Sequence, residues 1–234
     1  RIDFQEAEEV VFTSYRSGSM VTIPQPNGEP KRYNEEAGIV FTQSNFFKIF
    51  DRLILAGDTK KGLDNPNEAI ISQRWALKYF GREDVIGEVV KFDTHEYKIT
   101  AIMEDFPNNT DFPFDLMLSY ATIKKESEEN GWNSIWSDEQ CYFLLKEGES
   151  IAKIESRLAA FTEKYRGKER PDNSMFMVQP LTELHFDERF GTYSNNTIDR
   201  VMLIAFGIIA LILIVTACIN FINLATAEAI NRSK

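Results

Sequence analysis

The most prominent hydropathy feature is an uncharged run toward the C-terminal end of the sequence. No Asp, Glu, Lys or Arg occurs from Val201 to Ala227, and the dense first part, Val201 to Ile219, is mostly Leu, Ile, Val and Phe. About 20 apolar helical residues are needed to cross a hydrocarbon core of about 30 Å. The fourteen Leu, Ile, Val and Phe residues up to Ile222 sum to about −4 to −8 kcal/mol on an insertion scale. A membrane span is therefore favoured over a buried core helix.

The charges beside this run predict its orientation. Arg232 and Lys234 follow it, with only Glu228 opposing them, whereas residues 187–200 before it have no excess of Lys and Arg. Since Lys and Arg are retained on the cytoplasmic side of a membrane, the preceding domain is expected to face away from the cytoplasm. The sequence starts at Arg1 without a targeting segment, so an earlier span that takes the chain outward is expected.

Two carboxamides interrupt the apolar run. Asn220 and Asn223 are three positions apart and therefore lie on one face of the predicted helix. An amide in hydrocarbon seeks a hydrogen-bond partner on a neighbouring helix. We identify Asn220 and Asn223 as candidate helix-packing and coupling residues, with small side chains beside them for close approach at Ala217, Ala225 and Ala227.

Before the span, short apolar runs between turn signals predict strands. The early ones are Val10–Phe12, Ser19–Ile23 and a run ending at 39–41. A short helix over residues 46–50, capped by Ser44 or Asn45, carries an aromatic face that is typical of core rather than of a cofactor site. Residues 67–81 predict a strand, an N-cap at Ser72, a helix and a closing glycine, and residues 88–103 predict a hairpin.

Residues 141–180 predict a β-α-β unit. An apolar run at 141–145 is followed by apolar residues at helical spacing from Ile151 to Tyr165, and Met175–Val178 is expected to form the second strand.

The composition of the chain disfavours several classes of partner and site. The chain has 26 Lys and Arg against 36 Asp and Glu, a net charge of −10, which disfavours nucleic acid as a partner. The two cysteines and two histidines do not form a pair at metal-ligand spacing, so neither a metal site nor a disulfide scaffold is expected. The acidic clusters at 6–9 and 126–129 are typical of solvated surface, and no catalytic motif, phosphate loop or Walker motif is present.

Five segments, in order, resemble the periplasmic core domain and following helix of MacB/FtsX-like ABC-transporter permeases, especially the long two-domain permeases typical of Bacteroidetes. They are FTQSNFFKIFDRLILAGD (41–58), NEAIISQRWALKYFGREDVIGEVVKF (67–92), YKITAIMEDFPNNTDFPFDLMLS (97–119), QPLTELHF (179–186) and TACINFINLATAEAINRSK (216–234). The last segment and the ALKYFG…IG pattern are the most specific. The resemblance extends over nearly the whole chain beyond the first 40 residues.

The resemblance implies an α+β architecture. A porter-like β-α-β subdomain would comprise residues 1–50 and 136–196, with a smaller β-rich subdomain inserted at about 51–135. Together they would form a periplasmic core domain over 1–196, followed by a long transmembrane helix at 197–227 and the start of a cytoplasmic segment at 228–234. A first transmembrane helix would precede Arg1.

The resemblance also implies a function in the bacterial inner membrane. A separate cytoplasmic ABC ATPase would supply energy, and this chain would relay its motion to the periplasm for export or extraction of a substrate. The chain itself would be neither an enzyme nor a cofactor-binding protein. Its partners would be the ATPase, other permease helices or a second permease copy, the lipid membrane, and a periplasmic adaptor or substrate. Two alternatives stay open: the ligand-binding ectodomain of a membrane sensor, and a permease-like regulator of a cell-wall hydrolase.

Overall fold

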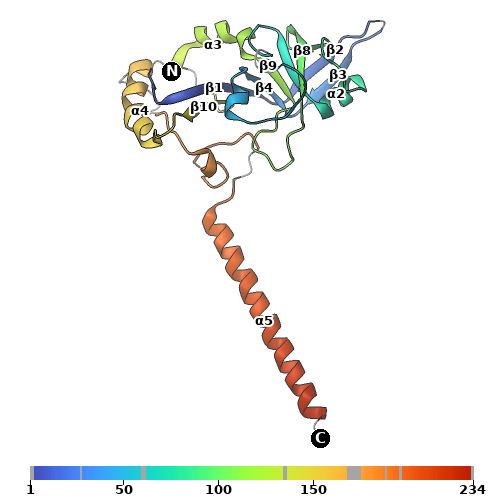
Figure 1. The fold of residues 1–234 in the computed structure, drawn as a ribbon, viewed down its shortest axis with the longest axis vertical. Helices are drawn as coiled ribbons and strands as arrows, with labels where there is room; N and C mark the ends of the chain where they lie inside the picture. The colour runs from blue at the N-terminus through green and yellow to red at the C-terminus, as the bar shows by residue number, and fades with distance from the viewer. Residues whose placement is uncertain are drawn as a thin grey trace. The chain divides into compact units, whose positions relative to one another are not determined.

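The protein is represented by a computed structural model that describes residues 3–26, 28–58, 62–133, 136–167, 175–187, 189–194 and 197–232. By contact the chain forms two compact units, Arg1–Pro180 and Leu181–Lys234 (Figure 1). The first unit contains the β-sheet, and the second contains the long C-terminal helix. The units divide N-terminal to the expected domain end at residue 196, and that end stays a prediction.

Within the described residues, ten strands form one mixed sheet in the order β10-β1-β4-β9-β6-β8-β7-β2-β3, with β5 paired to β8. The strands are β1 (Ala7–Arg16), β2 (Ser19–Ile23), β3 (Lys31–Glu35), β4 (Ile39–Thr42), β5 (Ile54–Gly57), β6 (Glu68–Ser72), β7 (Val89–Phe92), β8 (His95–Met103), β9 (Leu116–Ser119) and β10 (Glu139–Leu145). The β4–β9 and β6–β8 pairs are parallel, and the other pairs are antiparallel.

The helices are α1 (Phe46–Ile49), α2 (Gln73–Phe80), α3 (Lys124–Asn130), α4 (Ile151–Arg166) and α5 (Arg200–Arg232). Short 3-10 turns lie at Tyr120–Thr122, Gly131–Asn133 and Leu181–Glu183. The mixture of one sheet with separate helices and a long apolar C-terminal helix confirms the predicted α+β fold class.

The hydrogen-bonded ladder passes through both predicted subdomains. Strand β2, from the first 50 residues, pairs with β7 through Val21–Phe92 and Thr22–Lys91. Strand β9, from the segment expected to be inserted, lies between β4 and β6. The sheet is therefore continuous, and the division into porter-like and inserted parts stays a prediction.

The helix at 73–80 forms where the sequence pattern places it. The hydroxyl of Ser72 accepts a hydrogen bond from the backbone N–H of Trp75 at 3.3 Å, as an N-cap residue does. Gly81 adopts a left-handed φ of 71°, and its N–H donates to the carbonyl of Leu77 at 2.9 Å. The predicted hairpin is also present as β7 and β8.

Two local expectations differ from the structure, and one strand was not expected from the sequence. Met175–Val178 is not a strand. Phe176 and Val178 pack beside α4 and β10, and Met175 and Met177 are exposed. The alternating pattern therefore identifies the side of the segment that packs against the protein, but this segment does not pair with a strand among the described residues. The side chain of Asn45, at the N-cap of α1, makes no capping hydrogen bond there and donates to the carbonyl of Val10 instead. Strand β9 was not expected: its first three residues are apolar and all four are buried, so it lacks the alternation that reveals a half-buried strand.

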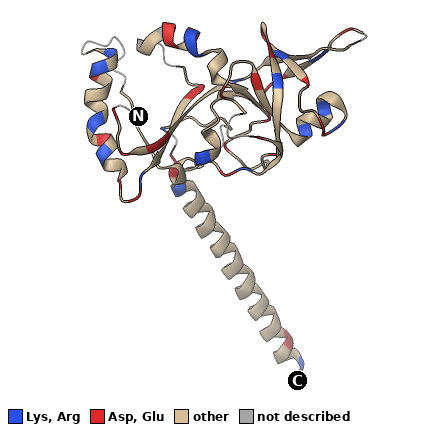
Figure 2. Ribbon diagram, turned by 45° about the horizontal axis from the view of Figure 1, so that its top comes forward, with Lys and Arg blue, Asp and Glu red and all other residues tan. Residues whose placement is uncertain are grey.

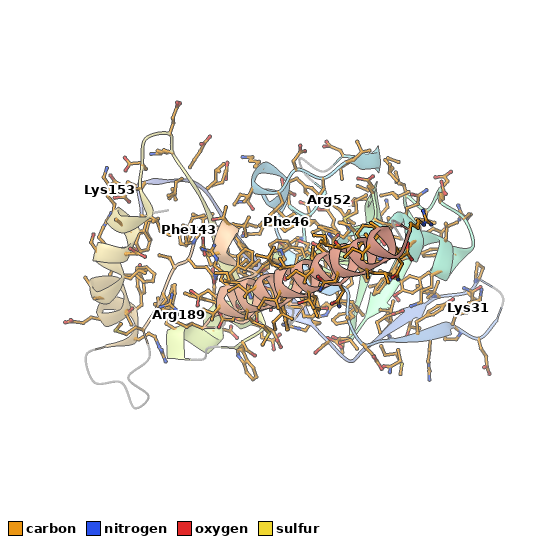
Figure 3. All side chains as sticks on the ribbon, turned by 90° about the horizontal axis from the view of Figure 1, so that it is seen from below. Lys31, Phe46, Arg52, Phe143, Lys153 and Arg189 are labelled. Atoms are coloured by element: carbon orange, nitrogen blue, oxygen red, sulfur yellow. The ribbon has the colours of Figure 1, made fainter. Side chains whose placement is uncertain are left out.

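Among the described residues of the first unit, two apolar clusters are prominent. The larger one joins the inner faces of the central strands to Trp75, Ala76 and Tyr79 of α2. The smaller one contains Phe4, Ile154 and Leu158, with flanking side chains that include Phe143 of β10. Phe143 and Lys153 of α4 are labelled in Figure 3 at this end of the unit. Ion pairs tie the chain start to α4, and hydrogen bonds from Lys164 and Tyr165 hold the pKa of Asp3 below its ordinary value.

Asp115 is buried where several segments of the first unit meet. Its Oδ1 accepts hydrogen bonds from Ser72 Oγ at 2.7 Å and Arg74 Nε at 2.5 Å, and Oδ2 accepts from Arg74 Nη2 at 2.6 Å. Its backbone N–H donates to the carbonyl of Gly38, and its carbonyl accepts from the N–H of Ser72, both at 2.7 Å. Because a buried carboxylate must be paired and hydrogen-bonded, these contacts fix β6, α2 and the start of β9 against the start of β4.

Gly38 completes this junction. Its N–H donates to the hydroxyl of Tyr15 on β1 at 3.0 Å. Its φ is +102°, and a Cβ built there would lie 2.8 Å from Cζ2 of Trp75 and 3.2 Å from Oδ2 of Asp115. Both the backbone conformation and the close approach of the indole ring therefore require glycine.

Replacing Gly38 with alanine should lower the free energy of unfolding by about 2–4 kcal/mol, because overpacking and a strained φ add together. Gly148→Ala is the matched control: φ is +80°, but no atom lies within 4 Å of an added Cβ. It should cost only about 1 kcal/mol. Urea unfolding of the detergent-solubilised chain measures both, and equal losses would show that packing against Trp75 contributes nothing.

Residues 1–196 should be soluble and unfold in one cooperative transition without α5, because the apolar clusters and the Asp115 junction lie within the first unit. Circular dichroism and tryptophan fluorescence melts of the chain shortened after residue 196 should coincide. Separate transitions, or aggregation that appears only when α5 is removed, would show that the helix is needed for folding.

Candidate functional site

Helix α5 is the principal candidate for a functional element. It has 33 residues, which corresponds to a length of about 50 Å at 1.5 Å per residue. Every one of its residues is exposed in this chain. In the ribbon of Figure 2, the colours of charged residues occur in α5 only near its two ends. In the part of the chain that the structure describes, it is the one helix long and apolar enough to cross a membrane.

The polar side chains of α5 fall into two kinds. The hydroxyls of Thr216 and Thr226 donate to the carbonyls of Ile212 and Ile222 at 2.8 and 2.7 Å, so the helix satisfies them itself. The carboxamides of Asn220 and Asn223 make no hydrogen bond with the described part of the chain. They remain available to a neighbouring helix, and their packing role stays a prediction.

The segment before α5, residues 181–199, is here called the lead-in segment. Arg200, the first residue of α5, reaches back to it: Nη2 donates to both carboxylate oxygens of Glu183, at 2.8 and 2.7 Å. The same guanidinium lies over the ring of Phe186, 4.7 Å from its centroid. An exposed ion pair contributes about 0.2–1 kcal/mol, and an exposed cation–π contact contributes about 0.5–1 kcal/mol.

Backbone contacts hold the same two parts together. The N–H of Ile198 donates to the carbonyl of His185 at 2.8 Å. The carboxylate of Asp199 accepts from the N–H of Val201 at 2.8 Å, as an N-cap residue does, and its carbonyl accepts from Leu203. The lead-in segment therefore folds back on itself and closes at the first turn of α5.

A second ion pair lies within the lead-in segment. Arg189, labelled in Figure 3, donates from Nε and Nη2 to the two carboxylate oxygens of Asp187 at 2.8 and 2.6 Å. These hydrogen bonds hold the pKa of Asp187 below its ordinary value. Because Asp187 and Arg189 are two residues apart and both lie outside α5, this pair is local to the lead-in segment.

The other sequence candidates do not form a catalytic site. Glu6 pairs with Arg157 at 2.8 Å and Glu9 with Lys48 at 2.6 Å, so two acids of the first cluster stabilise the fold separately. The acids of α3 are exposed, as expected of a solvated face. Among the described residues, His, Cys, Asp and Glu side chains do not gather in a group that could hold a metal ion.

The contact between Arg200 and Glu183 was not expected from the sequence. In the sequence, Arg200 is one charge beside the apolar run, and Glu183 is 17 positions away, a separation that matches neither helical nor strand spacing. A local signal does exist for Asp199, because Asp directly before an apolar helical run is typical of an N-cap.

Comparison with known proteins identifies the family. Residues 3–161 match the family model of the MacB-like periplasmic core domain. This match covers more than half of the chain, so the chain belongs to the MacB-like periplasmic core domain family, whose members are parts of ABC-transporter permeases. A search of curated proteins found no match.

Two solved structures show the same fold. One is described as "a domain of a putative Permease protein from Porphyromonas gingivalis", with a TM-score of 0.54 and 19% identity over 69% of this chain and 65% of that one. The other is the periplasmic region of MacB from Actinobacillus actinomycetemcomitans, with a TM-score of 0.50 and 12% identity over 69% of each chain. This chain thus spans about two thirds of each structure's length.

Proposed function

We propose that this chain is the periplasmic and membrane part of an ABC-transporter permease, and that it relays motion of a cytoplasmic ATPase to the periplasm for export or extraction of a substrate. The observation that carries the proposal is the combination of a MacB-like core domain, matched over residues 3–161, with the long, exposed apolar helix α5 further along the same chain. The ATPase would be a separate subunit, and the energy would reach this chain only as movement.

The fold supports a mechanical role. One continuous sheet, cross-linked by the Asp115 junction, resists internal bending because many hydrogen bonds would have to break together. At the same time, the described residues do not present a cluster of titratable groups arranged for catalysis. A stiff domain joined to a membrane helix suits the transfer of displacement better than a chemical step.

Asn220 and Asn223 are the residues through which α5 would contact neighbouring permease helices. They share one face, while Cys218 is about 200° around the helix from Asn220 and faces elsewhere. Their unused donors and acceptors favour partner helices, from the same permease or a second copy, that offer polar groups at the same depth. The pair would keep α5 in register with the helices that the ATPase moves.

The proposed location is the bacterial inner membrane, with the core domain in the periplasm. The charge difference across α5 supports this orientation, since Arg232 and Lys234 follow the apolar run. Lys234 itself lies outside the described residues. A periplasmic adaptor or the substrate would then meet the core domain, and the ATPase would act from the opposite side.

Thiol labelling tests the orientation. In a chain with Cys141 and Cys218 replaced by serine, Asn65→Cys should react with a membrane-impermeant maleimide added to intact spheroplasts. Asn65 is exposed, so access does not depend on unfolding. Ser233→Cys, at a position outside the described residues, should react only after the membrane is permeabilised. The reverse pattern would contradict the proposed topology.

The double substitution Asn220→Leu with Asn223→Leu tests coupling. It should leave membrane insertion intact and remove ATPase stimulation by transport substrate in the reconstituted permease–ATPase complex, because each lost interhelical hydrogen bond weakens assembly by about 0.6–2 kcal/mol. Thr226→Val is the matched control, since that hydroxyl is satisfied within α5, and it should couple normally. Wild-type stimulation in the double variant would remove both asparagines from the site.

A further inference from the structure

We propose that Arg200 locks the lead-in segment to the first turn of α5, so that the segment and the helix move as one body. The inference concerns a positioning residue. Its role in relay rests on the function proposed above, but the mechanical link itself can be measured without an ATPase.

The first argument is the closed path of contacts. Three described connections join the lead-in segment to the residues around the start of α5: the Glu183–Arg200 pair, the His185–Ile198 hydrogen bond, and the Asp199 cap on Val201. The first of these is made by the Arg200 side chain, which also lies over the ring of Phe186, so both contacts of this side chain join the helix to residues well before it in the sequence. The backbone contact of His185, by contrast, reaches Ile198, which precedes the helix.

The second argument is the charge of Arg200. A cation in the first turn opposes the helix dipole, whose positive end lies at the helix N-terminus. Glu183 offsets this penalty by placing a carboxylate at the same end. The carboxylate of Glu183 therefore both pairs with Arg200 and interacts favourably with the positive end of the helix dipole.

The third argument is position along the helix. Arg200 directly precedes an uncharged run of 27 residues, Val201 to Ala227. A guanidinium resists entry into hydrocarbon, so Arg200 sets how far the helix can slide inward. The pair with Glu183 and the ring of Phe186 extends that restraint to the lead-in segment. An axial or tilting movement of α5 is thereby passed to the segment instead of being absorbed by fraying of the first turn.

The Asp187–Arg189 pair provides the comparison within the molecule. It makes hydrogen bonds as short as those of the Glu183–Arg200 pair, and it lies in the same segment. Its partners are both outside the helix. Breaking it should disturb the local turn and leave the link to α5 intact.

The experiment measures the link in the chain with α5, reconstituted in phosphatidylcholine vesicles. Cys141 and Cys218 are replaced by serine, and spin labels are placed at Thr182→Cys in the lead-in segment and Ala205→Cys in α5, both exposed positions. Electron–electron double resonance then gives the distribution of distances. Arg200→Gln and Glu183→Gln should each broaden it about twofold, and the double variant should be no broader than either, because both remove one interaction.

Three further variants make the test specific. Asp187→Asn should leave the width unchanged. Arg200→Lys should give an intermediate width, because lysine keeps the charge and loses the planar guanidinium. The exchange Glu183→Arg with Arg200→Glu should narrow the distribution relative to the single glutamine variants. An unchanged width in Arg200→Gln and Glu183→Gln, or equal broadening in Asp187→Asn, would overturn the proposal.

The same labels separate this proposal from the proposed function. In complex with the ATPase, ATP should shift the Thr182 label in the wild-type chain, and the shift should be lost in Arg200→Gln. A broadened resting distribution with an unaltered ATP-dependent shift would overturn the role of Arg200 in relay. If ATP moves neither label in the wild-type chain, the relay function fails, and the link is then judged from the resting widths alone.

Discussion

The buried carboxylate of Asp115 is the constraint on which the rest of the first unit depends. Its side chain is only 7% exposed, while its partner Arg74 is 38% exposed, so the acid is the member that needs the pair. Removing one partner of a buried pair costs about 3–5 kcal/mol. Since the same residue also bonds Gly38 and Ser72 through its backbone, its hydrogen bonds hold the central strands and α2 in one arrangement together.

This constraint explains why one sheet can serve as a rigid body. Residues from four distant parts of the sequence, including Tyr15 on β1, meet within hydrogen-bonding distance of the junction. A domain that relays movement needs such stiffness, because any internal yielding would absorb the displacement. In the proposed mechanism, the places that remain free to move are outside the first unit.

The second unit differs from the first because its main element is an exposed apolar helix. All described residues of its helix are exposed in this chain, and in the proposed membrane span α5 would be surrounded by lipid or other helices. Thr216 and Thr226 satisfy their hydroxyls on the helix backbone, whereas the carboxamides of Asn220 and Asn223 make no hydrogen bond with the described part of the chain. At the other end, Arg200 remains in a polar setting through Glu183 and Phe186. In the proposed membrane span, the depth of each position in the hydrocarbon would therefore limit which side chains α5 can have there.

The sequence alone determined the features that depend on neighbouring residues: the apolar helix, the Ser72 cap, the Gly81 stop and the β7–β8 hairpin, because period and capping chemistry are local. It also indicated the family. Tertiary structure decided what depends on contacts between distant residues: the order of the sheet, the burial of β9, the irregular path at 175–178, and the pairing of Asp115 with Arg74 and of Glu183 with Arg200. A strand's pattern shows which face is buried but not which strand lies beside it. A charged residue, likewise, does not reveal its partner until the fold has brought the two together.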